Sequence, residues 1–181
     1  MNKVRFYELY KSTKRIHQND DEFWKFLEVI IPEEPKRILE MGTAHGGTAL
    51  IFQEIGTQVI SVDNKGVSGQ IPMEMFNPEV TTFLTADTHD STTLAQVKEM
   101  MPEVDLLFID GDHTYPGTLQ DWEMYSPLVR PGGLVVFHDI AYGRTRNPES
   151  EIKAGKVFDE VRGDLRVQEI FVEHGIGILW V

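Results

Sequence analysis

The chain has 181 residues, of which 41% are hydrophobic and 25% are charged, as is typical of one globular domain with a sizeable core. Its formal net charge of −12 disfavours nucleic acid as a substrate or partner, because phosphate backbones would be repelled. The absence of cysteine excludes disulfides and thiolate-bound zinc, and no apolar run approaches the ~20 residues of a membrane helix.

The amino-terminal region, residues 1–35, predicts a short helical extension. Its opening stretch, MNKVRFYELYK, lacks the apolar run and cleavage site of a signal peptide, so we expect a cytoplasmic protein without a membrane partner. Apolar residues recur at helical spacing over residues 3–15 and 20–31, and Asn19 is a candidate cap for the second helix. Pro32 ends the helical region.

From residue 36 onward, short apolar runs alternate with helical patterns. The expected strands contain residues 37–39, 59–62, 81–84, 106–109 and 134–137. The expected helices between them contain residues 47–55, 91–101 and 118–128. The strand runs are almost continuously apolar, which is typical of parallel strands covered by helices on both faces.

The carboxyl-terminal segment predicts a different arrangement. A helix over 154–161 is followed by two strand-like runs, 167–172 and 176–181, with only Glu173-His174-Gly175 between them. So short a connection requires an antiparallel hairpin. We therefore expect residues 36–181 to form a Rossmann-like, doubly wound α/β domain, with a mostly parallel seven-stranded sheet that ends in this hairpin.

A glycine-rich stretch, ILEMGTAHGGT, begins at Ile38, where the first predicted strand turns into a helix. Glycines let a ligand approach the backbone there, and the helix N-terminus offers free N–H groups. Asp63 ends the second predicted strand, where an acidic residue binds the ribose hydroxyls of an adenosine. The glycines loosely fit a dinucleotide loop, but Glu40 would place a carboxylate beside a pyrophosphate.

S-adenosylmethionine fits these residues better than a dinucleotide. It has no phosphate, and its ammonium and sulfonium can pair with Glu40 directly or through water. Asp87, after the third predicted strand, either accepts a hydrogen bond from the adenine or is a turn or capping aspartate. The residues that we predict to bind the donor are Glu40, Gly42, Thr43, Ala44, Gly46, Asp63, Asn64 and Asp87.

Polar residues follow the fourth and fifth predicted strands. Asp110, Asp112 and His113 come after one strand, and His138 and Asp139 come after the next, which a Pro-Gly-Gly turn introduces. Carboxylates favour magnesium, calcium or manganese, and imidazole shifts the preference toward manganese, iron or zinc. Structural alternatives also exist, since Asp112 can cap the next helix and either histidine can satisfy a loop.

The segment IDGDHTYPGTLQDWEMYSPLVRPGGLVVFHDI, beginning at Ile109, resembles class I S-adenosylmethionine-dependent methyltransferases related to cephalosporin hydroxylase and sugar O-methyltransferases. The ending HGIGILWV is also similar to that group, and the resemblance extends over residues ~36–181. It implies a Rossmann-like fold, S-adenosylmethionine as donor and magnesium-dependent O-methylation, with Asp110 and Asp139 as metal ligands. His138 departs from the second acidic residue of metal-dependent relatives, which leaves open a metal-free mechanism with His113 or His138 as base.

We therefore expect a methyltransferase that acts on a hydroxyl of a small metabolite, such as a sugar or a polyketide-like compound. The catalytic candidates are Asp110, His113 and His138, and the metal candidates are Asp110, Asp112, His138 and Asp139. A non-catalytic S-adenosylmethionine-binding module and, less favoured, an NAD-dependent oxidoreductase are the alternatives. Because the extension is short, any cap over the acceptor is small or comes from a second subunit of a homo-oligomer.

Two further segments have open interpretations. Residues 67–78 either form an apolar flap over the adenosine or, the favoured alternative, pack on their neighbours. Tyr142, Arg144 and Arg146 follow the fifth strand closely enough to reach an anionic substrate, or else belong to a solvated loop.

Overall fold

The amino-terminal extension forms two helices, α1 (Lys3–Thr13) and α2 (Asp20–Ile30), followed by a 3-10 turn, η1 (Ile31–Glu33). The structure is a computed structural model, and it describes residues 1–13, 19–68, 71–142, 144, 146–147 and 149–181. The side chain of Asn19 accepts a hydrogen bond from the backbone N–H of Glu22, which confirms Asn19 as the cap of α2. The apolar face of α2 is buried, as its spacing predicts: Phe23, Phe26, Leu27 and Ile30.

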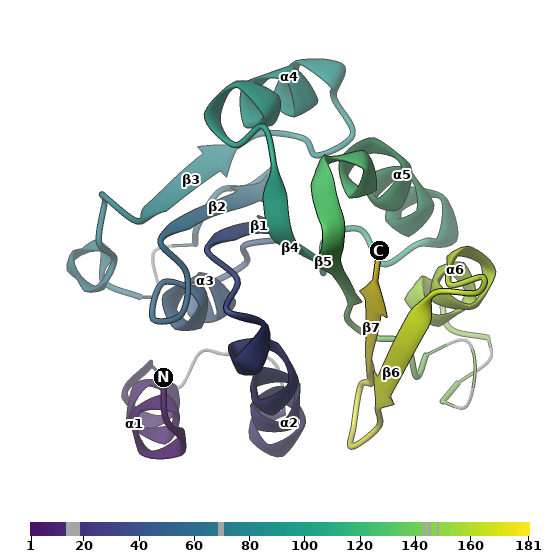
Figure 1. The fold of residues 1–181 in the computed structure, drawn as a ribbon, viewed down its shortest axis with the longest axis horizontal. Helices are drawn as coiled ribbons and strands as arrows, with labels where there is room; N and C mark the ends of the chain where they lie inside the picture. Colours follow the sequence, from purple (N-terminus) through teal and green to yellow (C-terminus); the bar gives the residue numbers. More distant parts are fainter. Residues whose placement is uncertain (14–18, 69–70, 143, 145, 148) are drawn as a thin grey trace.

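Seven strands form a single sheet in the order β3-β2-β1-β4-β5-β7-β6. Their bounds are β1 (Arg37–Met41), β2 (Gln58–Asp63), β3 (Thr81–Thr85), β4 (Val104–Ile109), β5 (Val129–Phe137), β6 (Arg166–Ile170) and β7 (Ile176–Trp180). Strands β1 to β5 pair in parallel, whereas β7 is antiparallel to both β5 and β6. The predicted doubly wound α/β fold with a terminal antiparallel hairpin is confirmed (Figure 1).

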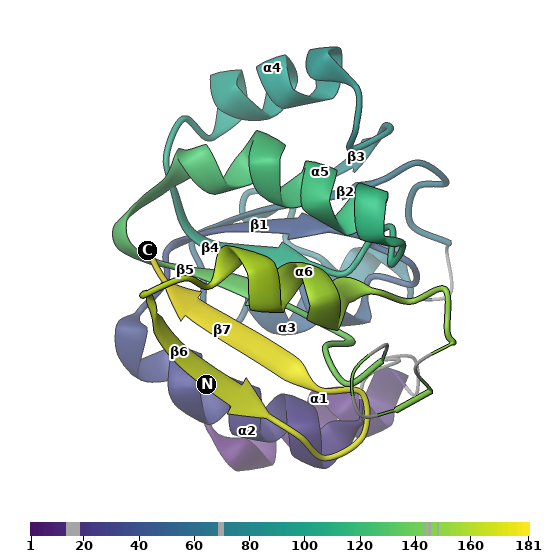
Figure 2. The same ribbon diagram turned by 90° about the vertical axis from the view of Figure 1, so that its right-hand side faces the viewer.

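Helices cover both faces of this sheet (Figure 2). On one face lie α4 (Ser91–Met100), α5 (Tyr115–Tyr125) and α6 (Ala154–Val161), and on the other lie α1, α2 and α3 (Gly47–Phe52). Alternate strand residues therefore enter two different cores: Ile38 packs with the α2 and α3 side, and Leu39 with the α4 to α6 side. This double burial explains why the strands are continuously apolar.

The extension shares a core with the sheet. The ring of Phe26 lies 6.4 Å from that of Phe52 on α3 and 5.7 Å from that of Phe108 on β4, measured between ring centroids. Phe6 on α1 joins the same cluster through Phe23, with 6.2 Å between their ring centroids. The start of α2 is thus fixed relative to the strands that carry the site.

Several boundaries differ from the sequence prediction: α3, expected over residues 47–55, ends at Phe52, and β6, expected over residues 167–172, ends at Ile170. Helix α5 begins at Tyr115 rather than at residue 118, because the hydroxyl of Thr114 caps it by accepting from the Gly117 N–H. The predicted turn at residues 131–133 lies inside β5, where the pairing shifts from Val104↔Val129 to Leu106↔Leu134. The other short 3-10 turns are η2 (Met73–Met75) and η3 (Ser126–Leu128).

The described part of residues 67–78 packs against the body of the protein. Ile71 and Phe76 are buried in the core, and Phe76 makes an edge contact with Phe83 at 4.8 Å between ring centroids. This contact supports the packing interpretation, although residues 69–70 lie outside the described residues. Across the described ranges, no helix is both long and apolar enough to cross a bilayer.

Candidate active site

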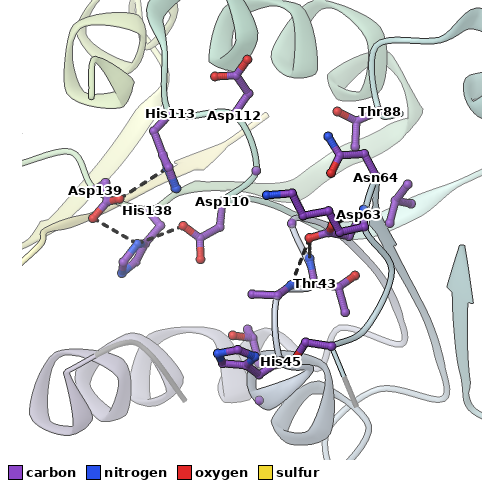
Figure 3. Close-up of a pocket in the computed structure, with 18 of the residues that line it drawn as sticks. Thr43, His45, Asp63, Asn64, Thr88, Asp110, Asp112, His113, His138 and Asp139 are labelled. Atoms are coloured by element: carbon purple, nitrogen blue, oxygen red, sulfur yellow. Dashed lines mark hydrogen bonds and ion pairs between the residues drawn. The ribbon is translucent and has the colours of Figure 1, made fainter. Parts of the chain in front are cut away.

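A cavity of about 860 Å³ lies at the carboxyl ends of the parallel strands. Its walls come from the loops that follow β1, β2, β3, β4 and β5, and from the β6–β7 loop, which contributes His174. Ligands bind at this edge in open α/β sheets, because the strand order reverses there and the loops diverge. Figure 3 shows Thr43, Asp63 and Asn64 on one side of this cavity, and Asp110, His113, His138 and Asp139 on the other.

The β1–α3 loop passes directly beneath the start of the β4–α5 loop. Gly42 has φ +97°, and a Cβ at this position would lie 2.3 Å from the carbonyl oxygen of Asp110. Only glycine allows this approach, so Gly42 joins the donor side to the acidic side of the cavity. Gly46, in contrast, starts α3 with φ +81° and does not line the cavity.

Asp63 holds the β1–α3 loop in place. Its Oδ2 accepts hydrogen bonds from the backbone N–H groups of Thr43 and Ala44, each at 3.1 Å. Its Oδ1 accepts from the N–H of Lys65 at 2.8 Å. These residues and Asn64 line the cavity.

Glu40 is buried behind the loop and does not line the cavity. Its Oε2 accepts from the Ser61 hydroxyl, which in turn lies 2.6 Å from the Thr43 hydroxyl at the cavity wall. Its Oε1 has no hydrogen-bond partner within the described part of the chain. Burial, reinforced by the negative charges of Asp110 and Asp63, raises the pKa of Glu40 well above its usual range despite the Ser61 hydrogen bond.

Asp87 and His89 line the far end of the cavity, after β3. Asp87 is exposed, and its Oδ1 accepts from the N–H of His89 at 2.9 Å, which is the turn alternative of the sequence analysis. The cap of α4 is Asp90, whose side chain accepts from the N–H of Thr92. The structure therefore shows Asp87 both in a turn and at the cavity wall.

Three side chains at the other end of the cavity form a compact group. One ligand atom each from Asp110, His113 and Asp139 lies within 4.8 Å of the others, an arrangement that fits one divalent cation. His113 Nδ1 is 3.4 Å from Asp139 Oδ2. Asp139 itself has φ +62°, a left-handed conformation that aspartate tolerates better than most residues.

His138 is buried between the two carboxylates. Its Nδ1 lies 3.1 Å from Asp110 Oδ1 and 3.4 Å from Asp139 Oδ1, without the alignment of a hydrogen bond to either. Burial alone would lower its pKa, but the charges of Asp110 and Asp139 raise the pKa of His138 to about 10. Burial would raise the pKa of Asp139, but His138, followed by His113 and His174, lowers it below its usual value.

Asp112 lies outside the group that the structure assembles, contrary to its predicted place among the metal ligands. Its Oδ1 accepts from the N–H of Thr114 at 2.9 Å, and its side chain packs where a Cβ on Gly117 would be. The loop turns back at this point to start α5, which directs Asp112 toward the helix and His113 toward Asp139. The third group beside Asp110 and Asp139 is therefore His113.

A methyltransferase domain family model matches residues 39–140. This range contains the glycine-rich loop, Asp63 and the compact group of Asp110, His113 and Asp139, called the acidic group below. The chain belongs to this methyltransferase family. The match begins at β1 and ends just beyond β5, so this methyltransferase domain includes all five parallel strands.

Individual relatives agree with the family assignment. A rhamnosyl O-methyltransferase of Mycobacterium bovis is 25% identical over 127 residues, which are 65% of this chain and 51% of that protein. An uncharacterized protein of Acanthamoeba polyphaga mimivirus, R132, is 28% identical over 111 residues, which are 56% of this chain and 50% of that protein. The methyltransferase domain thus spans about half the length of the curated relatives it matches.

Solved structures show the same fold. An O-methyltransferase from Bacillus cereus in complex with SAH superposes with a TM-score of 0.72 over 100% of this chain and 92% of its own, at 16% identity. The MycE methyltransferase of the mycinamycin biosynthetic pathway, in complex with Mg and SAH, gives a TM-score of 0.64 over 97% of this chain and 54% of its own, at 18% identity. These similarities identify the methyltransferase fold.

Sequence reasoning did not single out His174 as a site residue. It lines the cavity of the methyltransferase domain, and its Nδ1 lies 3.5 Å from Asp139 Oδ1. The antiparallel hairpin contains the missed signal: β7 starts opposite the end of β5, so the loop before β7 must lie beside Asp139. Tyr142 also lines the cavity.

The two arginines near Tyr142 have other partners. Arg144 pairs with Asp159 at 2.9 Å and with Glu169 at 3.2 Å. Arg146 donates to the backbone carbonyl of Glu173 at 2.5 Å. Neither lines the cavity, so contact with an anionic substrate, one of the two alternatives for these arginines, has no support in the structure.

Proposed function

We propose that this protein transfers the methyl group of S-adenosylmethionine to a hydroxyl of a small molecule. One observation carries the proposal: a single cavity joins the loop held by Asp63 to the group of Asp110, His113 and Asp139. Its volume of about 860 Å³ is in the range of sites for small molecules. A dinucleotide-dependent oxidoreductase lacks support, because the chain belongs to a methyltransferase family.

The residues at the donor side fit S-adenosylmethionine. Gly42, Thr43, Ala44, Asp63 and Asn64 all line the cavity. In this proposal Asp63 binds the ribose hydroxyls and Asp87 lies at the adenine. Glu40 acts from behind the loop through Ser61 and Thr43, instead of pairing directly with the donor.

The possible ligands at the opposite side of the cavity fit a divalent cation. Asp110 and Asp139 would supply its oxygen ligands, with His113 as the third group in reach. Magnesium prefers an all-oxygen site, so the imidazole favours manganese, iron or zinc if His113 is a ligand. When bound, such a cation would lower the pKa of the acceptor hydroxyl.

Methyl transfer is an in-line displacement: the acceptor oxygen bonds to the methyl carbon while the carbon–sulfur bond breaks, and the hydroxyl proton leaves. The chain must align the two substrates and assist the loss of that proton. His113, oriented by Asp139 at 3.4 Å, is the candidate base when no cation assists. His138 serves instead as a buried positive partner for Asp110 and Asp139.

We propose a sugar or another hydroxylated metabolite as the acceptor. The support is the similarity to rhamnosyl O-methyltransferases, together with the polar character of the cavity wall near Asp110 and His113. The acidic net charge of −12 argues against nucleic acid as the acceptor.

Two measurements test the proposal. Calorimetric titration should show binding of S-adenosylhomocysteine and none of NAD. Incubation with S-adenosylmethionine and methyl α-L-rhamnopyranoside, within a panel of methyl glycosides, should give a methylated sugar by mass spectrometry. Donor binding without transfer to any glycoside would favour the non-catalytic module, and binding of NAD alone would overturn the donor assignment.

A further inference from the structure

A buried carboxylate on α2 holds the loop between β6 and β7. Glu22 has no exposed surface, and its carboxylate accepts four backbone hydrogen bonds from that loop. The N–H groups of Val172, Glu173 and Gly175 donate to Oε2 at 2.8, 2.7 and 3.0 Å, and that of His174 donates to Oε1 at 3.1 Å. Such a concentration of backbone donors on one carboxylate fixes the path of the loop.

The position of Glu22 in the sequence suggests a purely local role that the structure does not show. Asn19 caps α2 and Glu22 follows three residues later, which is the spacing of a capping box. In a capping box the glutamate would accept from the N–H of the cap residue, but here its carboxylate accepts instead from four backbone N–H groups of the hairpin loop. The Asn19 side-chain amide also donates to Glu173, at 2.9 Å, so the start of α2 binds the loop twice.

The loop places His174 against the acidic group of the site. Its Nδ1 lies 3.5 Å from Asp139, and its ring stacks on Tyr142, with 5.8 Å between centroids and 20° between planes. His174 and Tyr142 both line the cavity. The backbone joins the same segments, because the Ala141 N–H donates to the His174 carbonyl at 2.9 Å.

We propose that Glu22 is a positioning residue that sets the acceptor side of the cavity through His174, and that His174 and Tyr142 form the wall against which the acceptor binds. This inference rests on the proposed methyl transfer for the meaning of the acceptor side. It assigns a function to α2, which lies outside the matched residues 39–140. The donor side should be independent, because the loop that Glu22 holds supplies no donor residue.

The test of the contacts between Glu22 and the β6–β7 loop is Glu22→Gln. This change keeps the size of the side chain, removes its charge and replaces one acceptor oxygen by a donating NH2 group. Asp105→Asn is the matched control. Asp105 is also buried and accepts two backbone N–H groups, from Lys36 at 3.1 Å and Arg37 at 2.8 Å. It lies near the amino end of β4, at the opposite edge of the sheet from the cavity.

Hydrogen exchange by mass spectrometry gives a readout that needs no substrate. We expect peptides containing residues 172–175 to exchange at least ~10-fold faster in Glu22→Gln and to keep the wild-type rate in Asp105→Asn. Unchanged exchange in Glu22→Gln would overturn the inference while leaving the proposed function intact. Failure of the wild-type protein to bind S-adenosylhomocysteine would instead count against the proposed function.

The second arm uses His174→Ala, which removes a partly exposed side chain and should fold even if Glu22→Gln does not. With methyl α-L-rhamnopyranoside as the probe, both variants should raise the KM for the sugar by about tenfold and leave the dissociation constant of S-adenosylhomocysteine within about twofold. His174→Gln, which retains a polar side chain, should recover part of the loss. A wild-type KM in His174→Ala, or an equal loss of donor binding, would refute the role of this wall.

Discussion

The Nδ1 atom of His113 lies 3.4 Å from Oδ2 of Asp139, although the two residues follow different strands and are far apart in the sequence. Strands β4 and β5 pair in parallel with Ile109 opposite Phe137, so both polar segments begin at the same level of the sheet. Asp110 lies beside this pair at the same end of the cavity, with one ligand atom of each of the three side chains within 4.8 Å of the others (Figure 3). A carboxylate and an imidazole in this relation can orient a base or complete a cation site.

Replacement of Asp139 by asparagine should remove most of the activity. Asparagine also tolerates the left-handed conformation, so the change removes charge with little effect on the backbone. We expect methyl transfer to fall on the order of 10²–10⁴-fold, because either a cation or the oriented base is lost. Asp112→Asn is the control, and a loss as large as that of Asp139→Asn would show that Asp112 belongs to the catalytic group after all.

Chelation should distinguish the two uses of His113. If Asp110 and Asp139 hold a cation, treatment with EDTA should abolish methyl transfer, and one divalent metal at a time should restore it. The metal that restores most activity reports whether the imidazole is a ligand, because manganese or zinc would then exceed magnesium. Full activity in chelator would eliminate the cation and leave His113 as the base.

Asp63→Ala should weaken the binding of S-adenosylhomocysteine by about 1–3 kcal/mol, since the ribose hydroxyls and the backbone N–H groups of Thr43, Ala44 and Lys65 lose their acceptor. The enthalpy and affinity are measured by calorimetry. Asp63→Asn is the matched variant: it retains one oxygen for the N–H groups of Thr43 and Ala44 and should lose less. An affinity equal to wild type in Asp63→Ala would exclude Asp63 from the donor site.

Gly42→Ala should disrupt the junction between the donor loop and the acidic group. A methyl group there would lie 2.3 Å from the carbonyl oxygen of Asp110, so the β1–α3 and β4–α5 loops must separate. We expect loss of donor binding and a lower melting temperature. Gly163→Ala is the control, because Gly163 also has positive φ, +44°, but no atom lies within 4 Å of a Cβ there; equal effects would refute the clash.

Asp121 should make the protein less stable as the pH rises through its titration. Burial is the main cause that raises the pKa of Asp121 to about 6, from 3.8 in the unfolded chain. Between these two pKa values the folded state binds more protons than the unfolded chain, so the free energy of unfolding decreases as the pH rises. The full loss of stability from ionising the buried Asp121 is present above pH 6. The ionisable groups that influence or contact it are His89, Asp112, Asp87 and Tyr125.

Asp121→Asn should therefore be more stable than the wild type at pH 7.5, by up to about 3 kcal/mol, and should lose this pH dependence. Chemical denaturation at pH 4 to 8 provides the free energy of unfolding. The comparison variant is Asp90→Asn, since hydrogen bonds from Thr92 lower the pKa of Asp90 and give the opposite sign. A wild-type slope in Asp121→Asn would contradict the assignment.

The sequence alone determined the architecture and the general place of the site. Continuous apolar runs such as residues 106–109 and 134–137, alternating with helical patterns, indicated strands buried on both faces, and the short hairpin connection required an antiparallel end. Polar residues directly after such strands must lie at one edge of a parallel sheet. Asp110, His113 and Asp139 were therefore expected to lie near one another, as the structure shows.

The tertiary structure decided which side chains face one another, because a loop can turn its residues toward either side. Asp112 and His113 are adjacent in the sequence, yet only His113 reaches Asp139, since Asp112 binds the start of α5. Glu22 has the local pattern of a helix cap, but its carboxylate is satisfied by a loop about 150 residues away. Backbone donors in a distant hairpin leave no trace in the hydrophobic pattern or the motifs of a sequence, so only the folded chain reveals this contact.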